Sequence, residues 1–387
     1  MEFDALILGG GQLSKMLAEA GKSLGREIAY WGKAEDPCGQ AGFKVEPSLE
    51  KALHLAPLVL FENEFVDAEN LSKHLRADHR CFPDLKVIAA VQDKLNQKKL
   101  WDKIGLKHPE YRILDSAGDF RKSLAEIQNE FGDDFVLKWS RLGYDGYGTY
   151  FFSGDFDPAI EFCQRAHSKN IPIYAERKIN FVKEVSLVGA CKGEESYFYP
   201  LIWSVQDHGI CRQALGPAIG LGIDSSLEVQ AFEIGKSIAG SLSLEAVFAV
   251  EMFVDQSNQL WINELAPRVH NTAHFSMTAY NVGQFELHMR LAFGLEIPKL
   301  EARSKFWGML NILGKGDSKI SSERLENFQK QTANGFEYFW YAKEQVRPRR
   351  KMGHINFLAA SELELNHQCE RAEKIEKELW GNWNDII

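Results

Sequence analysis

Short apolar runs separated by a helical pattern occupy about the first 90 residues of the chain. Residues 4–8 (DALIL) form an apolar run that stops at three consecutive glycines. Apolar side chains then recur at helical spacing over residues 12–24, and further apolar runs cover residues 28–31 and 58–61. The order strand, helix, strand predicts a parallel α/β sheet for this part of the chain.

From residue 92 onward, strand patterns are more frequent than helical ones. We expect helices over residues 92–104, 227–242 and 284–293, strands over residues 135–140, 173–178, 184–191 and 197–205, and a hairpin of residues 246–255 and 259–266. Beyond Pro298, strand patterns at residues 308–313, 338–342 and 354–358 and a charged helix over residues 362–379 predict a small third unit.

The composition is that of an ordinary globular protein, and it narrows the possible partners. Of 387 residues, 45% are hydrophobic and 26% are charged, and the net charge is −9. This charge argues against nucleic acid or an acidic membrane as a partner. The six cysteines are scattered without a C-x-x-C pair, which favours free thiols in a reducing compartment. Because the N-terminus is acidic and no apolar stretch is long enough for a membrane span, we expect a cytoplasmic protein.

Two glutamates in the predicted hairpin form the strongest candidate site. Glu251 and Glu264 lie at equal distances from the polar turn Ser257-Asn258, so in a symmetric hairpin they face each other. Two carboxylates that close repel unless a cation or a proton lies between them. Oxygen ligands suit Mg²⁺, and Asn263 adds another oxygen if a local bend turns it inward. Two exposed or arginine-paired acids would fit the same spacing.

The loop after the hairpin carries a cation, an imidazole and an amide. Arg268, His270 and Asn271 follow the second strand of the hairpin directly. Such groups can bind an anion beside metal-bound phosphates and stabilise charge that develops on oxygen. A hydrogen-bonded structural loop is an equally good interpretation of these residues alone.

A second loop, over residues 141–148, is rich in glycine and follows the strand that carries Lys138. Glycines let backbone N–H groups close over phosphates, and a lysine at the strand end can neutralise one of them. No Gly-Lys-Ser/Thr follows, so this is not a Walker loop. A flexible surface turn is the alternative.

The glycine turn before residue 12 matches only part of a dinucleotide-binding fingerprint. Ser14 stands in place of the third glycine, and Tyr30-Trp31 stand where an acid is expected. The turn can still hold a phosphate at a helix N-terminus. Residues 347–351 (RPRRK) are the densest positive cluster, which either grips one phosphate or faces solvent.

Taken in order, these segments resemble the N5-carboxyaminoimidazole ribonucleotide synthase family of ATP-grasp ligases. Nine segments run parallel with the family from end to end, among them LILGGGQLSKML (6–17), LKWSRLGYDGYG (137–148), INELAPRVHN (262–271) and VRPRRKMGH (346–354). The last two blocks in one chain are highly specific for this family.

The resemblance implies an ATP-grasp fold of the α/β class, with α+β character in its central part. A Rossmann-like preATP-grasp domain would cover residues 1–92, an ATP-grasp domain with two lobes that clasp ATP residues 93–297, and a small C-terminal domain residues 298–387. The implied reaction of purine biosynthesis carboxylates 5-aminoimidazole ribonucleotide with bicarbonate and ATP, through carboxyphosphate. ATP and Mg²⁺ are the implied cofactors and a homodimer is the implied assembly.

The resemblance also implies roles for individual positions. The metal ligands would be Glu251 and Glu264. The catalytic groups would be Asp145, Arg268, His270 and Asn271. The ATP-binding groups would be Lys94, Lys138, Gly143, Tyr144, Asp145, Gly146, Gly148, Glu176, Arg177, Lys178, Ile179, Glu184, Asn263 and Glu264. The groups that bind the ribonucleotide would be Gln12, Glu64, Tyr144, Asp145, Arg268, Arg350 and Lys351.

Several positions depart from the family pattern. Lys94 replaces an arginine, Tyr147 replaces a Lys or Arg of the glycine-rich loop, and Arg349 replaces a glycine. Further departures are Gln206, near a common histidine, and Val269, Thr272 and Ala273, in place of Pro, Ser and Gly. They bear on efficiency and nucleotide affinity more than on the reaction class.

Three other functions remain open. Another ATP-grasp ligase would share the acidic hairpin but not both specific blocks. A catalytically weak nucleotide-binding protein would account for Lys94 and Tyr147. An oxidoreductase would require the glycine turn to bind a dinucleotide.

Overall fold

The computed structural model describes residues 2–115, 119–143, 146–316, 320, 322–332 and 335–381, and the strands of these ranges form three sheets. The N-terminal sheet is parallel, as the sequence predicts, with the order β3-β2-β1-β4-β5. Alternate residues of β1 belong to two different apolar clusters, so both faces of this sheet are buried. Its strands are β1 (Ala5–Leu8), β2 (Ile28–Trp31), β3 (Lys44–Glu46), β4 (Leu58–Phe61) and β5 (Arg80–Phe82), and its helices are α1 (Gln12–Ser23), α2 (Pro37–Gln40), α3 (Leu49–Ala52), α4 (Ala68–His74) and α5 (Leu85–Val91).

A four-stranded antiparallel sheet follows, with the order β6-β9-β7-β8. Two amphipathic helices pack on one face of this sheet and enclose an apolar core of their own. Helix α6 (Lys94–Ile104) leads into this part; Asp93 caps it by accepting a hydrogen bond from the backbone N–H of Leu95. The elements are β6 (Tyr111–Ile113), β7 (Phe135–Trp139), β8 (Thr149–Phe152), β9 (Ile173–Arg177), α7 (Phe120–Phe131) and α8 (Phe156–His167).

The third sheet is the largest, and it holds both strands of the predicted hairpin. Its order is β15-β14-β10-β12-β13-β16-β18-β17, with β11 paired to β10. The strands are β10 (Phe181–Lys192), β11 (Glu195–Phe198), β12 (Ile202–Asp207), β13 (Ile210–Gly216), β14 (Val247–Asp255), β15 (Leu260–Ala266), β16 (Phe306–Leu313), β17 (Phe336–Trp340) and β18 (Lys351–Ala359). The helices are α9 (Ser225–Leu242), α10 (Ser276–Ala279), α11 (Gln284–Ala292), α12 (Ser322–Thr332) and α13 (Glu362–Trp380), with short 3-10 turns at Ala218–Leu221 and Asn271–Ala273.

Two features differ from the expectation. The strands of the expected third unit continue the large sheet, because β16 pairs with β13. The expected strand over residues 197–205 is two strands, β11 and β12, because Pro200 lies between them and has no N–H for a ladder. After this break β12 pairs with both β10 and β13, whereas β11 pairs with β10.

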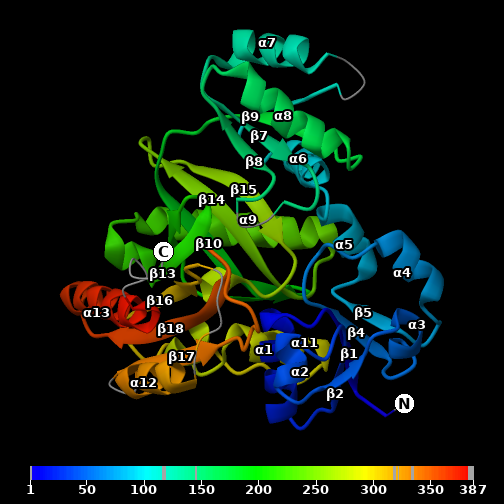
Figure 1. Cartoon of the computed structure of the whole chain (residues 1–387), viewed down its shortest axis with the longest axis vertical. Helices are drawn as coiled ribbons and strands as arrows, with labels where there is room; N and C mark the ends of the chain where they lie inside the picture. The colour runs from blue at the N-terminus through cyan, green and yellow to red at the C-terminus, as the bar shows by residue number, and fades with distance from the viewer. Residues whose placement is uncertain are drawn as a thin grey trace.

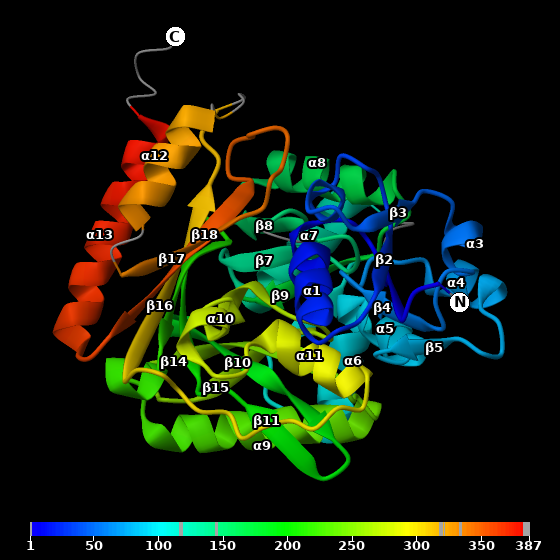
Figure 2. The same cartoon turned by 90° about the horizontal axis from the view of Figure 1, so that it is seen from below.

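The four-stranded sheet with α7 and α8 lies above the large sheet in Figure 1, and the N-terminal sheet lies beside them. Figure 2 shows α12 and α13 along β16, β17 and β18, with α9 on another side of the large sheet. All six cysteines are free thiols. Within the described ranges, no helix combines the length and the apolar character that a membrane span needs.

Candidate active site

The two hairpin glutamates face each other, as predicted, and a β-bulge makes this pairing possible. Met252 pairs with Ile262, but the next pair is Glu251 with Glu264, so Asn263 is an extra residue on β15. The bulge brings Asn263 and Glu264 to the same partly exposed face while Ile262 and Leu265 stay buried. The bulge is therefore the local bend that Asn263 needs in order to offer its side-chain oxygen beside the two glutamates.

Lysines from two different elements reach this face of the hairpin. Lys94 Nζ lies 2.7 Å from Glu264 Oε2, and Lys138 Nζ donates to Asn263 Oδ1 at 2.9 Å. Burial alone would lower the pKa of Lys94, but the carboxylates of Glu264 and Glu251 raise it above its usual value. Lys94 is therefore charged beside the acidic pair, and both lysines lie where they can hold phosphate oxygens.

Glu176 belongs to a buried ion cluster that sequence reasoning did not find. Its Oε2 lies 2.6 Å from Lys138 Nζ, and its Oε1 contacts the ammonium of Lys98, whose side chain is 1% exposed. Burial would raise the pKa of Glu176, but Lys138 and Lys98 lower it to about 2. Lys98 stands four residues after Lys94 on α6, so helical spacing was the signal that could have identified it. Both oxygens of Glu176 contact lysines, so this side chain positions Lys138.

Glu184 extends the acidic face onto the neighbouring strand. Ser186 on β10 pairs with Glu251 on β14, and Glu184 lies two residues before it on the same face. Burial and the charge of Glu251 raise the pKa of Glu184 to about 7. A cation beside Glu251 would relieve this repulsion.

The donor set of the hairpin fits Mg²⁺. Glu251 and Glu264 offer carboxylate oxygens and Asn263 an amide oxygen, which are the hard ligands that Mg²⁺ takes in proteins. Within the described residues, no group of three or more His, Cys, Asp or Glu side chains forms a complete metal site. A magnesium ion here would therefore take further oxygens from phosphates or water.

The PRVHN loop (residues 267–271) packs directly on the acidic pair. His270 Nε2 lies 3.5 Å from Glu251 Oε1, and His270 Nδ1 lies 2.9 Å from Thr272 Oγ1. Burial, together with the charges of Arg268 and Lys351, lowers the pKa of His270 well below its usual value. The imidazole is therefore neutral at pH 7, and the positive charge of this region comes from the arginine and the lysine.

Arg268 joins the loop to the N-terminal domain. Its Nε lies 2.5 Å from Glu64 Oε2, and a second contact joins its Nη2 to Glu64 Oε1 at 3.2 Å. The arginine side chain is 16% exposed and the glutamate 8%, so this two-point ion pair is largely desolvated. Glu64, which the resemblance assigns to binding of the ribonucleotide, thus lies beside the PRVHN loop.

Asn271 is held by a residue of the C-terminal part of the chain. Its Nδ2 donates to Asn311 Oδ1 at 3.0 Å, and Asn311 Nδ2 donates back to Asn271 Oδ1 at 2.6 Å. Asn311 lies on β16, is fully buried and also donates to the backbone oxygen of Cys211, which fixes the orientation of both amides. Among the described residues, the second N–H of the Asn271 amide has no hydrogen-bond partner, so it can donate to a ligand.

The glycine-rich loop (residues 141–148) connects β7 to β8 at the edge of the site. A Cβ atom added at Gly143 would lie 3.8 Å from Lys94 Nζ. A Cβ atom added at Gly146 would lie 3.3 Å from the backbone oxygen of His208. Tyr144 and Asp145, predicted to bind ATP and the ribonucleotide, lie outside the described residues.

Tyr147, which replaces a basic residue of the family pattern, is packed on an indole ring. The ring centres of Tyr147 and Trp139 are 5.1 Å apart, and Lys169 Nζ donates to the Tyr147 hydroxyl at 2.9 Å. Lys169 therefore places a cation beside the loop although Tyr147 itself has none.

The side chains of Arg177 and Lys178 have partners outside the acidic face. Arg177 Nε donates to Glu110 Oε2 at 2.9 Å, and Lys178 Nζ lies 2.8 Å from Asp134 Oδ2. An adenine contact from residues 177–179, Ile179 included, would therefore come from the main chain, and it stays a prediction.

The basic loop (residues 347–351) lies near the PRVHN loop. The positive charge of its Lys351 lowers the pKa of both His270 and His274. Arg350 donates to the backbone oxygen of Gln345 at 3.0 Å. Arg349, which replaces a glycine, has φ = +66° and donates to the backbone oxygen of His208. The backbone of this loop thus keeps the left-handed conformation that glycine favours, at a cost of about 1–2 kcal/mol.

The glycine turn holds a carboxylate of the chain itself. Glu62 Oε2 accepts a hydrogen bond from the backbone N–H of Gly11 at 2.8 Å, and a side chain on Gly11 would collide with this carboxylate. The expected phosphate at the N-terminus of α1 would therefore compete with Glu62 for this donor. Gln12 follows in the first turn of α1.

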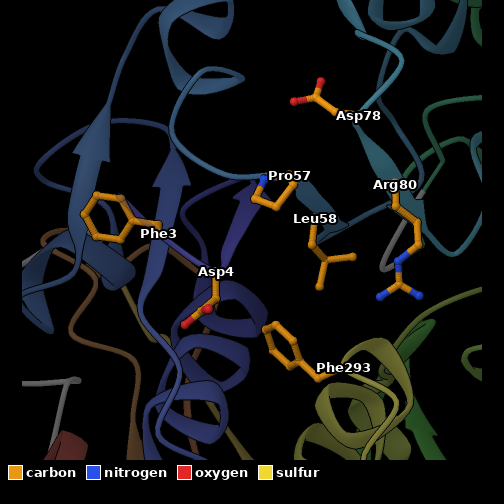
Figure 3. A pocket seen from close by; sticks show the side chains of 7 residues that line it. All are labelled: Phe3, Asp4, Pro57, Leu58, Asp78, Arg80 and Phe293. Carbon is orange, nitrogen blue, oxygen red and sulfur yellow. The ribbon is translucent and has the colours of Figure 1, made fainter. Parts of the chain in front are cut away.

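An open cavity of about 660 Å³ lies at the other end of the N-terminal sheet (Figure 3). Its lining comes from the amino-terminal ends of β1, β4 and β5 and from the segment after α11: Phe3, Asp4, Pro57, Leu58, Asp78, Arg80 and Phe293. Ligands of parallel α/β sheets bind beyond the carboxyl ends of the strands, where the glycine turn lies. The cavity is therefore separate from the candidate site.

Two family models match the chain. The model described as the ATP-grasp domain matches residues 99–285, and the model described as the phosphoribosylaminoimidazole carboxylase C-terminal domain matches residues 308–368. The first range contains the hairpin and the PRVHN loop, and the second contains Asn311 and the basic loop.

Relatives match over nearly the whole chain. The phosphoribosylaminoimidazole carboxylase of Saccharomyces cerevisiae is 31% identical, with 94% of this chain and 64% of the relative covered. The chain thus spans less than two thirds of that relative. The N5-carboxyaminoimidazole ribonucleotide synthase of Synechococcus elongatus is 28% identical, with 97% of this chain and 95% of the relative covered.

Solved structures have the same fold. The carboxyaminoimidazole ribonucleotide synthase of Aspergillus clavatus complexed with ATP has a TM-score of 0.87 at 26% identity, and 98% of this chain and 99% of that chain are covered. Its complex with ADP and 5-aminoimidazole ribonucleotide has a TM-score of 0.84 at 25% identity, with 97% and 99% covered. With the acidic hairpin, the PRVHN loop and the basic loop gathered in one site, these matches confirm the resemblance: the chain belongs to the N5-carboxyaminoimidazole ribonucleotide synthase family of ATP-grasp ligases.

Proposed function

We propose that this chain carboxylates 5-aminoimidazole ribonucleotide with ATP and bicarbonate, giving N5-carboxyaminoimidazole ribonucleotide, ADP and phosphate in purine biosynthesis. The observation that carries the proposal is the contact between the PRVHN loop and the acidic pair, with 3.5 Å between His270 Nε2 and Glu251 Oε1. This contact places the PRVHN loop, which can bind a small anion, beside the acidic pair, which can bind the metal of a metal-bound triphosphate. The names of the relatives and the ligands of the Aspergillus clavatus enzyme support this choice of reaction.

In this proposal the triphosphate of ATP binds along the hairpin, between the acidic pair and the two lysines. Lys94 and Lys138 would contact phosphate oxygens, since their ammonium groups already lie 2.7 Å from Glu264 and 2.9 Å from Asn263. Magnesium held by Glu251 and Glu264 would neutralise the charge of the phosphates. The glycine-rich loop would cover them from the other side with backbone N–H groups.

Bicarbonate would bind at the PRVHN loop and attack the γ-phosphorus, so that the bond to ADP breaks and carboxyphosphate forms. Arg268 supplies positive charge there, because His270 is neutral, and Asn271 supplies an N–H. The exocyclic amine of the ribonucleotide then takes the carboxyl carbon and phosphate leaves. Glu64 would hold Arg268 in place, and Gln12, Arg350 and Lys351 would bind the ribonucleotide.

We further propose that the reaction requires Mg²⁺ and that the enzyme works as a homodimer in the cytoplasm. The oxygen donors of the hairpin support the metal, and the family resemblance supports the dimer. Light scattering on the purified chain tests the assembly, and nucleotide binding with and without EDTA tests the metal.

Steady-state ADP release tests the function directly. We expect release only when ATP, bicarbonate and 5-aminoimidazole ribonucleotide are all present, and loss of release when any one is omitted. Glycinamide ribonucleotide and free amino acids serve as controls for other ATP-grasp ligases. Release with a control substrate would favour another ligase, and ATP binding without any stimulated hydrolysis would favour a weak nucleotide-binding protein.

A further inference from the structure

Gln284 has a fully buried side-chain amide that contacts both the backbone N–H and the backbone oxygen of one residue of the PRVHN loop, His270. It is the first residue of α11, and none of its side chain is exposed. Its Oε1 accepts from the backbone N–H of His270 at 2.7 Å, and its Nε2 donates to the backbone oxygen of His270 at 2.7 Å. The same Nε2 lies 2.9 Å from His274 Nδ1.

These contacts determine the orientation of the amide. A backbone N–H can only donate, so the atom of Gln284 that faces His270 N must be the oxygen. The nitrogen then has two hydrogens, one for the oxygen of His270 and one for His274 Nδ1. His274 Nδ1 is therefore an acceptor, and a neutral His274 carries its proton on Nε2.

The surroundings of His274 keep its ring neutral. The ring is fully buried, and the groups that face it from other elements are His354 on β18 at 4.7 Å between ring centres, Tyr341, Phe285 and Lys351. Burial and the charge of Lys351 lower the pKa of His274 to about 3. Only one of these groups is charged, and its charge is positive.

We propose that Gln284 is a positioning residue for the carboxylation, which holds the backbone of His270 and selects the Nε2–H tautomer of His274. The role of Gln284 in the carboxylation rests on the proposed function, but its contacts with His270 and the tautomer of His274 do not. Because the imidazole of His270 points from this backbone toward Glu251 and Thr272, a shift of the loop would misalign the site. A misplacement of about 1 Å can lower a rate about 100-fold.

The start of α11 supports this role. The backbone N–H of Gln284 donates to Ser276 Oγ at 2.9 Å, and Ser276 Oγ donates to the backbone oxygen of Ala273 at 2.6 Å. Gln284 thus contacts the chain before and after Asn271, and it holds the loop through residues other than those that contact the acidic pair.

The variant Gln284→Glu tests the proposal, because it keeps the shape and the acceptor but loses both donors. A carboxylate beside His274 Nδ1 should draw the ring proton to Nδ1, which ¹⁵N spectra of the histidine ring report without any substrate. We expect the wild-type ring as the Nε2–H tautomer, a changed ring state in the variant, and a fall in kcat of about 10- to 100-fold. The KM for ATP should change less than about threefold, since the triphosphate site is not touched.

Gln97→Glu is the matched control. Gln97 is also buried and holds Leu265 in the same way, with Oε1 accepting from its N–H at 2.8 Å and Nε2 donating to its oxygen at 3.0 Å. Its other contact is the backbone oxygen of Val91 rather than an imidazole. This variant should leave the spectrum of His274 unchanged.

Three results would overturn the proposal: a wild-type His274 with its proton on Nδ1, an unchanged ring in Gln284→Glu, or a kcat that falls no further than in Gln97→Glu. The first needs no variant, so a variant that fails to fold leaves the proposal testable. If wild-type protein releases no ADP with 5-aminoimidazole ribonucleotide, the proposed function fails, while the spectra still decide the role of Gln284.

Discussion

Replacing Lys98 by Met should destabilise the protein strongly although this residue has no direct contact with the hairpin glutamates. Lys98 and Lys138 hold the two oxygens of Glu176, and the exposed fractions of the three side chains are 1%, 14% and 3%. The methionine would fill most of the volume but leave Glu176 buried with only one cation. Breaking one side of a buried ion pair costs about 3–5 kcal/mol.

The pKa of Glu176 gives an independent estimate of the same magnitude. Its net fall from 4.5 to about 2, in which the two lysines outweigh the burial of the carboxylate, corresponds to about 3 kcal/mol of stability. Because the pKa is lowered in the folded state, this stability is present above pH 4.5 and is lost as the pH falls toward 2. We therefore expect Lys98→Met to cost about 3 kcal/mol at pH 7 and clearly less near pH 3.

Urea unfolding followed by circular dichroism measures this cost, with ligand absent. Lys178→Met is the matched control, because Lys178 pairs with Asp134 at exposed fractions of 40% and 61%. An exposed pair contributes about 0–1 kcal/mol. If Lys98→Met costs no more than the control, or costs the same at pH 3 as at pH 7, the ion cluster does not stabilise the fold as reasoned. Glu176→Gln combined with Lys98→Met should recover part of the loss.

Three further outcomes are expected. Glu251→Gln and Glu264→Gln should each lower ADP release at least about 100-fold, because the phosphates lose a metal ligand; near-normal turnover in both would contradict the metal site. Lys351→Ala should raise the KM for the ribonucleotide about tenfold with kcat little changed, if the lysine binds ground and transition states alike; an unchanged KM would mean that the basic loop does not bind it. In metal-free protein, Glu184→Gln should add about 3 kcal/mol of stability at pH 8.5 and almost none at pH 4.5, because a pKa raised from 4.5 to about 7 makes the folded state lose stability as the pH rises from 4.5 to about 7; urea midpoints at the two pH values measure this.

The sequence predicted the elements whose apolar pattern is long or whose ends carry clear signals. The parallel N-terminal strands β1, β2 and β4 and the hairpin of β14 and β15 lie within a residue or two of their predicted ranges. Strands such as β3 and β5 have only three residues, so their apolar pattern is too short to recognise. The pairing of β16 with β13 joins residues about 100 positions apart, which no local pattern can indicate.

The candidate site was predicted where adjacent residues carry the chemistry. Glu251 and Glu264 pair as a symmetric hairpin predicts, but only because the bulge at Asn263 shifts the register by one residue; the PRVHN loop was found because it follows the hairpin directly. Asn311 and Lys98 were not found, since each acts through a partner distant in sequence, Asn271 or Glu176. The side chains of Arg177 and Lys178 contact Glu110 and Asp134, which a motif cannot reveal, and their predicted role in ATP binding stays a prediction.

The bulge at Asn263 changes the phase of the apolar pattern in β15. Ile262 and Leu265 are both buried although they are three positions apart, so two neighbouring polar residues share one face of the strand. A chain that lacked Asn263 would regain strict alternation and would still place an acid opposite Glu251. Deleting this single residue would thus keep the carboxylate pair and remove the amide that contacts Lys138, and an apolar spacing of three inside a strand marks where such a site can be found in other sequences.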